Sequence, residues 1–409
     1  MTELEVMGKK AREASRRLAK AGTNEKNAGL RAAADSLRKN APQILEANQI
    51  DLENARANNM KPALIDRLLL DEARIEAIAQ GMEAVADLDD PIGQIEHMSR
   101  RPNGLLIGRM RVPLGVVGAI YEARPNVTAD VFALTYKSGN AVILKGGKEA
   151  ANSNKAITEA IRSALDDPDA VQLIEDNSRE NTAKFMRLRE YVDVLIPRGG
   201  KGLIQAAVTQ ATIPVIETGT GNCHAYIDES ADDDMAVSII NNGKTQRIGV
   251  CNALESIVVN SKKLGMLKKL EEKLDEHHVQ IRADERSLPY FDHAVPADEA
   301  DYSTEYLDYI ISVKTVDSLD EAIEHINRCS TGHSETIITN DYGNAARFLN
   351  EVDSAAVYVN ASTRFTDGNE FGFGAEIGIS TQKLHARGPM GLDALTTTKF
   401  IVQGTGQIR

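Results

Sequence analysis

Residues 141–157 read AVILKGGKEAANSNKAI, and this stretch decides the fold class. A short apolar run is typical of a buried strand, two glycines then allow a tight turn, and a helical pattern follows. Residues 195–208, LIPRGGKGLIQAAV, repeat the same order. Open α/β sheets bind ligands beyond the carboxyl ends of their strands, where helix N-termini attract anions. Both basic glycine turns are therefore candidates for an anionic cofactor site; the alternative is that they only turn the chain.

Further apolar runs on both sides of this stretch alternate with helical patterns. The first series comprises residues 116–120, 141–145, 192–196 and 213–216, and the second comprises residues 256–260, 309–314, 335–339 and 356–360. Such alternation predicts parallel sheets, and two series predict two α/β domains. Residues 3–88 read as consecutive amphipathic helices interrupted at 22–27 and 58–62. Residues 105–112 and 397–403 alternate like edge strands and predict a small sheet suited to pairing with a second subunit.

The composition is that of an ordinary globular protein and excludes several function classes. The 409 residues carry 47 Lys and Arg against 60 Asp and Glu, a net charge of −13. A surface of this charge repels nucleic acid. Residues 1–22 form a charged amphipathic pattern rather than a signal peptide, and no apolar stretch approaches the ~20 residues that span a bilayer. We therefore expect a cytoplasmic protein whose partners include neither nucleic acid nor membrane.

The cysteines raise the question of a reactive thiol. Cys223, Cys251 and Cys329 are too few for a disulfide framework. Cys251 lies between a predicted helix and a predicted strand, with Arg247 upstream and no carboxylate before Glu255, and positive surroundings favour a thiolate. The alternative is a small buried cysteine. A histidine follows Cys223, but successive strand residues point to opposite faces, so no metal site is expected. Cys329 is expected to pack at a helix end.

Longer motifs place these features in a known family. GVVGAIYEARPN (115–126), SGNAVILKGG (138–147), VIETGTGN (215–222) and FGFGAEIGIS (371–380) occur together with Cys251, which follows Glu217 by 34 residues. Their order and spacing resemble the landmarks of the aldehyde dehydrogenase superfamily. KTQRIGVCNALE (244–255), DEAIEHINRCSTGHSETI (320–337), VNASTRFTDG (359–368) and GAEIGISTQKLHARGPMGL (374–392) are most similar to a branch that reduces an acyl phosphate. The resemblance covers essentially the whole chain.

The resemblance implies an α/β fold of the aldehyde dehydrogenase type, with two parallel-sheet domains and a small β oligomerisation flap. Residues 1–103 and 118–222 would form an NADP-binding domain, residues 223–392 a catalytic domain, and residues 104–117 and 393–409 the flap. It also implies a homo-oligomer, at least a dimer. Contact with glutamate 5-kinase, which would make the labile acyl phosphate, is a further hypothesis.

The reaction implied is the NADPH-dependent reduction of L-glutamyl 5-phosphate to L-glutamate 5-semialdehyde and phosphate, the second step of proline biosynthesis. A thiolate can displace phosphate to give a thioester that accepts hydride, and Cys251 would be this nucleophile. The Cys251 N–H and the Asn126 side chain would stabilise the oxyanion. Glu217 is similar to the residue that activates water in hydrolytic relatives. Here it would either handle protons near Cys251 or pack the cofactor site, and both roles stay open.

The resemblance also implies which residues bind the two small molecules. Those for NADP(H) are Lys145, Gly146, Arg198, Gly199, Gly200 and Glu305. A cation at Lys145 suits the extra 2′-phosphate of NADP, whereas Glu305 would hold the nicotinamide ribose or be a solvated strand-edge acid. For the substrate, Ser362, Thr363 and Arg364 offer a compact set of donors, and Arg124 and Arg247 are rivals.

Two other functions stay open. A hydrolytic aldehyde dehydrogenase of broad specificity would need water activated by Glu217. A non-catalytic binding protein with the same fold would need neither Glu217 nor Cys251, and the presence of both argues against it. Dependence of NADP reduction on phosphate distinguishes the reductase from the hydrolytic enzyme.

Overall fold

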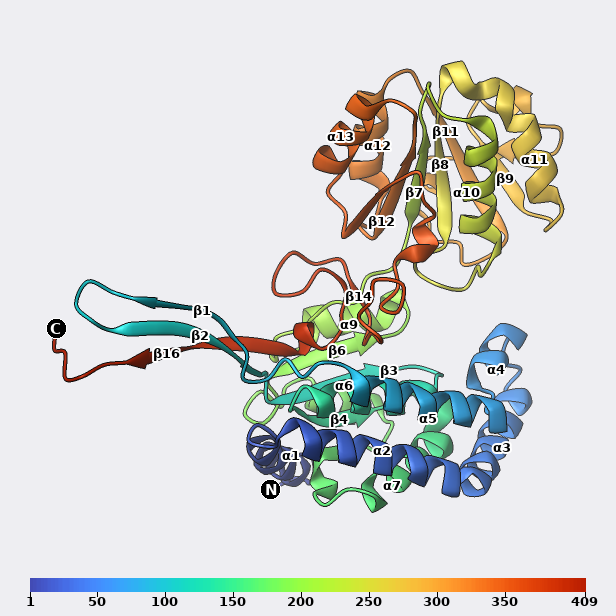
Figure 1. Ribbon diagram of the computed structural model, residues 1–409. Coiled ribbons are helices and arrows are strands. Elements are labelled where there is room, and N and C mark those ends of the chain that lie inside the picture. Colours follow the sequence, from blue (N-terminus) through green and yellow to red (C-terminus); the bar gives the residue numbers. More distant parts are fainter. The chain divides into compact units, whose positions relative to one another are not determined.

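The computed structural model of the protein describes the backbone of all 409 residues and every side chain except those of Pro62 and Ala63. The chain divides into two units, each with its own parallel sheet (Figure 1). Unit 1 comprises Met1–Thr218, Gly372–Gly378 and Met390–Arg409, and unit 2 comprises Gly219–Phe371 and Ile379–Pro389. Unit 2 therefore interrupts unit 1 along the sequence.

Unit 1 begins with the predicted amphipathic helices: α1 (Glu3–Leu18), α2 (Thr23–Lys39), α3 (Ala41–Ala57), α4 (Pro62–Leu68) and α5 (Glu72–Asp87). A capping box starts α1, in which the Thr2 hydroxyl and the Glu5 carboxylate each accept the other residue's backbone N–H. The breaks differ in detail from the prediction. Helix α2 already begins at Thr23, and an unexpected break occurs at Asn40, because Pro42 cannot donate to a continuing helix.

The sheet of unit 1 has four parallel strands in the order β5–β4–β3–β6. They are β3 (Val116–Tyr121), β4 (Ala141–Lys145), β5 (Val171–Leu173) and β6 (Val194–Arg198), with helices α6 (Asn126–Lys137), α7 (Ala151–Ser163), α8 (Arg179–Phe185) and α9 (Lys201–Gln210). The strand predicted at residues 213–216 is wrong. This segment runs beside β6 and makes one isolated bridge, through Val215, because Pro214 has no N–H to continue the ladder.

A separate three-stranded antiparallel sheet in unit 1 has the order β1–β2–β16. Its strands are β1 (Ile95–Arg100), β2 (Leu106–Pro113) and β16 (Thr396–Gln403). The two predicted edge segments therefore do pair, and the C-terminus follows β16 directly (Figure 1). The prediction missed β1, which is mostly exposed and lacks a regular apolar alternation. Phe400 and Val402 on β16 are 74% and 55% exposed.

Unit 2 contains a seven-stranded parallel sheet in the order β10–β9–β11–β8–β7–β12–β13. The strands are β7 (Cys223–Ile227), β8 (Leu254–Asn260), β9 (Gln280–Ala283), β10 (Val295–Pro296), β11 (Ile310–Val316), β12 (Ser334–Ile338) and β13 (Ala356–Val359), and a small ladder joins β14 (Ile379–Ser380) to β15 (Gly388–Pro389). The helices are α10 (Asp233–Thr245), α11 (Leu267–Asp275), α12 (Leu319–Cys329) and α13 (Tyr342–Glu351). All four strands predicted for this half are confirmed.

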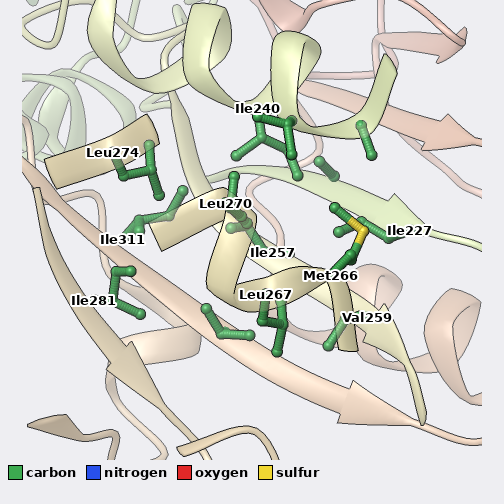
Figure 2. Packing of buried hydrophobic residues seen from close by; sticks show 14 of the residues in the cluster. Ile227, Ile240, Ile257, Val259, Met266, Leu267, Leu270, Leu274, Ile281 and Ile311 are labelled. Atoms are coloured by element: carbon green, nitrogen blue, oxygen red, sulfur yellow. The ribbon is translucent and has the colours of Figure 1, made fainter. Parts of the chain in front are cut away.

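Two apolar layers cover the two faces of this sheet. On one face Ile257 of β8 packs with Leu267 and Leu270 of α11 and with Ile240 of α10 (Figure 2). Val258, the next residue of β8, belongs to the opposite layer with α12 and α13. Side chains alternate across a strand, so a continuous apolar run is what a sheet buried on both faces requires. Strand β8 is thereby held rigidly, and the segment that enters it carries Cys251.

Candidate functional site

Cys251 lies half-buried between the end of α10 and the start of β8, in the helix–cysteine–strand order that the sequence predicts. The fully buried thiol of Cys223 on β7 donates to the Cys251 carbonyl oxygen at 3.3 Å. Among the described side chains, none of the three cysteines forms a disulfide. Burial strongly raises the pKa of the Cys223 thiol, so this cysteine stays protonated beside the nucleophile candidate.

The segment before β7 packs directly on the main chain of Cys251. A Cβ atom on Gly221 would lie 1.4 Å from the Cys251 carbonyl oxygen, so only glycine fits there. The Gly221 N–H donates to the Glu305 carboxylate at 2.7 Å. Glu305, assigned to the nicotinamide ribose by resemblance, therefore also holds the glycine that touches the nucleophile segment. Gly221 was not predicted to belong to the site, although it stands in the motif VIETGTGN (215–222).

Two arginines form the positive part of the site in unit 2. The Arg364 Nε donates to Gln246 at 2.9 Å, next in sequence to Arg247. Burial lowers the pKa of Arg364, the like charge of Arg247 acts in the same direction, and Cys251 opposes them. The two guanidinium groups and the cysteine thus share one electrostatic environment, which suits a thiolate and a phosphate.

The hydroxyls beside Arg364 have structural partners. Thr363 donates its proton to the Asn252 carbonyl at 2.8 Å, and Asn252 donates to the Thr366 carbonyl at 2.9 Å. Ser362 accepts the Arg364 N–H at 3.3 Å. These bonds fasten the predicted substrate segment to the residue that follows Cys251. Thr363 therefore positions Arg364, and its single proton is committed to the main chain.

The remaining predicted catalytic residues lie in unit 1. Asn126 is the first residue of α6, and its amide donates to Asp130 at 2.9 Å. Burial raises the pKa of Asp130 to about 6 against the opposing effects of Asn126 and Arg198. Arg124 is half-buried in the loop between β3 and α6. Glu217 is half-buried in the extended segment after α9. Asp130, which the sequence analysis missed, fixes the orientation of the Asn126 amide.

A pocket of about 220 Å³ opens beside the end of β4. Its lining residues are Gly146, Ala151, Asn152, Asn154, Lys155, Leu173, Glu175 and Asn177. A Cβ atom on Gly146 would lie 2.1 Å from the Asn154 amide nitrogen, so glycine is needed where β4 passes the pocket. Lys145 is buried with its ammonium on the Gly146 carbonyl at 3.1 Å, and burial lowers its pKa.

The second glycine turn is partly filled by a carboxylate. The Gly200 N–H at the start of α9 donates to Glu122 at 2.9 Å, and a Cβ on Gly199 would lie 2.6 Å from the same carboxylate. Arg198 donates to the Ile377 carbonyl. Glu122 thus accepts one of the N–H groups at the start of α9 that the sequence predicted for the cofactor diphosphate. Nothing in the local sequence spacing signals this contact.

The structure thus gathers the predicted residues into two sets. Unit 2 holds Arg247, Cys251, Glu305, Ser362, Thr363 and Arg364, whereas unit 1 holds Arg124, Asn126, Lys145, Gly146, Arg198, Gly199, Gly200 and Glu217. Within the described residues, no three His, Cys, Asp or Glu side chains form a group that could hold a metal. No helix among them is long and apolar enough to cross a membrane.

Comparisons with known proteins agree on one family. The model of the aldehyde dehydrogenase family matches residues 2–293 and 289–401. The gamma-glutamyl phosphate reductases of Lachnospira eligens and Agathobacter rectalis are 60% and 59% identical to the chain, each over 100% of both sequences. The crystal structure of gamma-glutamyl phosphate reductase from Thermotoga maritima matches with a TM-score of 0.97 and 50% identity, over 100% of both chains. The predicted family and fold class are confirmed.

Proposed function

The chain belongs to the gamma-glutamyl phosphate reductases of the aldehyde dehydrogenase family, and from this premise we propose how its residues carry out the reaction. The enzyme reduces L-glutamyl 5-phosphate to L-glutamate 5-semialdehyde and phosphate, a step of proline biosynthesis. We assign the chemistry to a thioester on Cys251. The observation that carries this assignment is the attachment of the segment with Arg364 to Asn252, the residue that follows Cys251, through the Thr363 hydroxyl and the Arg364 carbonyl.

The first step uses the thiolate. Cys251 attacks the acyl carbon, the bond from that carbon to the phosphate oxygen breaks, and phosphate leaves with its electron pair. Arg364 and Arg247 offer guanidinium groups to the phosphate and to the thiolate. The oxyanion of the tetrahedral stage would be stabilised by the Cys251 N–H and by the Asn126 amide, which Asp130 orients. The result is a thioester on the sulfur.

The second step reduces this thioester. NADPH, when bound, would supply a hydride for the thioester carbon. Cys251 would then leave as the thiolate with the electron pair of the carbon–sulfur bond, which releases the aldehyde. The pocket beside Lys145 and Gly146 is proposed for the adenosine end of the cofactor, because a buried cation there suits the 2′-phosphate. Arg198, Gly199 and Gly200 would adjoin the diphosphate. Glu305 would hold the nicotinamide ribose, in addition to its bond with Gly221.

We further propose roles for the two units, for the three-stranded sheet and for contact with a partner enzyme. Unit 1 would bind the cofactor and unit 2 the acyl group, as their respective residues suggest. The sheet of β1, β2 and β16 would join subunits of at least a dimer, because β16 is an edge strand with exposed apolar side chains. We also propose contact with glutamate 5-kinase, because the acyl phosphate is labile and such contact would protect it from water.

The decisive experiment runs the reaction in reverse. With glutamate 5-semialdehyde and NADP, reduction of NADP should require inorganic phosphate, because phosphate must release the acyl group from Cys251. In a single turnover without phosphate, the acyl enzyme should accumulate and be detectable by intact mass. Phosphate-independent NADP reduction with free glutamate as product would instead establish hydrolysis, with Glu217 as the base to test next.

A further inference from the structure

A buried ion pair closes the segment that carries the nucleophile. The Lys244 ammonium lies 2.6 Å from the Glu255 carboxylate, and both side chains are 0% exposed. Lys244 belongs to the last turn of α10, and Glu255 is the second residue of β8. Cys251 lies in the segment between them. The pair therefore fixes the distance between the two ends of this segment.

The same carboxylate connects this pair to the other contacts of Cys251. Glu255 accepts the N–H of Leu307 at 3.2 Å, and Leu307 holds a left-handed backbone conformation with φ of 52°. Two residues earlier, Glu305 accepts the N–H of Gly221, which packs against the Cys251 carbonyl. One path therefore leads from Lys244 through Glu255, the main chain of residues 305–307 and Gly221 to the main chain of Cys251.

Such a pair is a costly way to stabilise a core. Burial raises the pKa of Glu255 to about 7 despite the opposing charge of Lys244, and burial also lowers the pKa of Lys244. Well-packed apolar side chains often stabilise a core as well as a buried ion pair does, whereas a buried charge without its partner strongly destabilises the fold. What an ion pair adds is directional geometry. Its location around Cys251 suggests that geometry is what it provides.

We propose that Lys244 and Glu255 are positioning residues that set the placement of the Cys251 thiolate for attack. The proposal rests on the proposed function only in taking Cys251 as the nucleophile. Neither side chain is exposed to solvent, so neither is proposed to contact substrate. Misplacement of a nucleophile by about 1 Å can cost a factor of 10² in rate without weakening binding.

The test compares substitutions in the full-length enzyme. In K244M/E255Q, the glutamine can still accept the Leu307 N–H while both charges are removed together. We expect kcat to fall at least tenfold, with KM for the acyl phosphate and Kd for NADPH within threefold of wild type. The rate at which iodoacetamide alkylates Cys251 in the absence of substrate, measured by mass spectrometry, should differ at least fivefold from that of the wild type. A folded variant with kcat within twofold of wild type overturns the proposal.

A second pair of variants covers failure of the first to fold. Glu255→Asp keeps the charge but shortens the reach, and should lower kcat about tenfold. K244R/E255D restores the combined length and should recover kcat to within threefold of wild type. Wild-type kcat in E255D, or no recovery in K244R/E255D, would overturn the positioning role.

The matched control is the buried pair of Lys26 and Asp90 in unit 1, also separated by 2.6 Å. K26M/D90N should leave kcat and alkylation of Cys251 within twofold of wild type. An equal loss of kcat in this control would attribute the effect to general destabilisation and overturn the proposal. The phosphate dependence of the wild-type reaction tests the proposed function alone, whereas the alkylation rate tests the placement of the Cys251 thiol alone. Failure of the proposed function can therefore be told apart from failure of the positioning role.

Discussion

Gly221 offers the sharpest test of how Cys251 is held. Its backbone φ lies outside the left-handed region, so alanine is opposed there by space alone. The added Cβ would be 1.4 Å from the Cys251 carbonyl oxygen, 2.3 Å from the carbonyl carbon and 2.8 Å from the Cα, whereas ordinary contacts begin at 3.4 Å. The two backbones must therefore separate by about 2 Å. Both are main chain, so no flexible side chain can absorb the shift.

We expect Gly221→Ala to lower kcat at least 100-fold, because a displacement of about 1 Å already costs roughly 10²-fold in rate. Overpacking typically costs about 1 to 3 kcal/mol and occasionally more, so the unfolding midpoint must show that the variant is folded before its kcat is compared. The assay measures kcat, NADPH affinity by fluorescence titration, and the unfolding midpoint. NADPH affinity should fall less than kcat, since the pocket beside Lys145 belongs to unit 1 and only Glu305 of the proposed cofactor residues bonds to Gly221.

Gly265→Ala is the matched control, because a Cβ at Gly265 of unit 2 meets nothing within 4 Å. It should keep wild-type kcat. The reasoning fails if folded Gly221→Ala retains more than half of the wild-type kcat, or if Gly265→Ala loses as much activity as Gly221→Ala.

Four further outcomes are expected. NADPH should have a higher kcat/KM than NADH, and Lys145→Met should reduce that ratio at least tenfold; equal kcat/KM for both cofactors in the wild type would contradict the assignment. Removal of all residues after Lys399 cuts β16 in half and should release monomers, as measured by light scattering; an intact protein that is already monomeric at micromolar concentration would refute the flap's role. Cys251→Ser should lower turnover by about 10³ or more with NADPH binding retained, whereas Cys223→Ser should cost less than threefold because its hydroxyl can still donate to the Cys251 carbonyl; comparable losses would exclude Cys251 as the sole nucleophile. His325 is buried, and burial lowers its pKa from 6.5 to about 3. As pH falls below 6.5, the unfolded chain binds a proton at this histidine whereas the native state does not. The free energy of unfolding is therefore highest near pH 7.5 and falls on acidification. The free energy of unfolding of His325→Phe relative to the wild type should therefore rise by about 2 kcal/mol from pH 7.5 to pH 5, measured by urea unfolding. Parallel pH dependences of this free energy in the two proteins would contradict the prediction.

Several of the strands that the sequence predicted are buried on both faces, as β8 is, whereas the predicted β2 and β16 are partly exposed. Residues such as Ile257 and Val258 enter opposite apolar layers, which leaves an uninterrupted apolar run that sequence alone detects. Strands β1, β5 and β10 were missed because they are exposed or very short. Strands β7 and β9 were also missed, and β7 is fully buried although its sequence, CHAYI, contains a histidine and no continuous aliphatic run. The false strand at residues 213–216 had the apolar composition but contains Pro214.

The residues of the site also differ in how far the sequence could predict them. The resemblance pointed to Cys251 and Arg364 through motifs that are continuous in sequence. Contacts between distant segments left no such trace: Glu122 reaches Gly200 across 78 residues. Even Glu255, noted as the first carboxylate after Cys251, gave no sign that it would be buried against Lys244. Spacing predicts which face a residue occupies, whereas these pairings depend on how separate elements pack.

The interrupted arrangement of unit 1 has a consequence for synthesis of the chain. Strand β2 leaves the ribosome about 280 residues before the strand β16 that pairs with it. At roughly 5 to 20 residues per second, this edge waits on the order of tens of seconds for its partner. Charged side chains discourage pairing of an open edge with other chains. Arg109 and Arg111 on β2, ion-paired with Glu96 of β1, are therefore suited to protect the nascent hairpin against aggregation until β16 has been made.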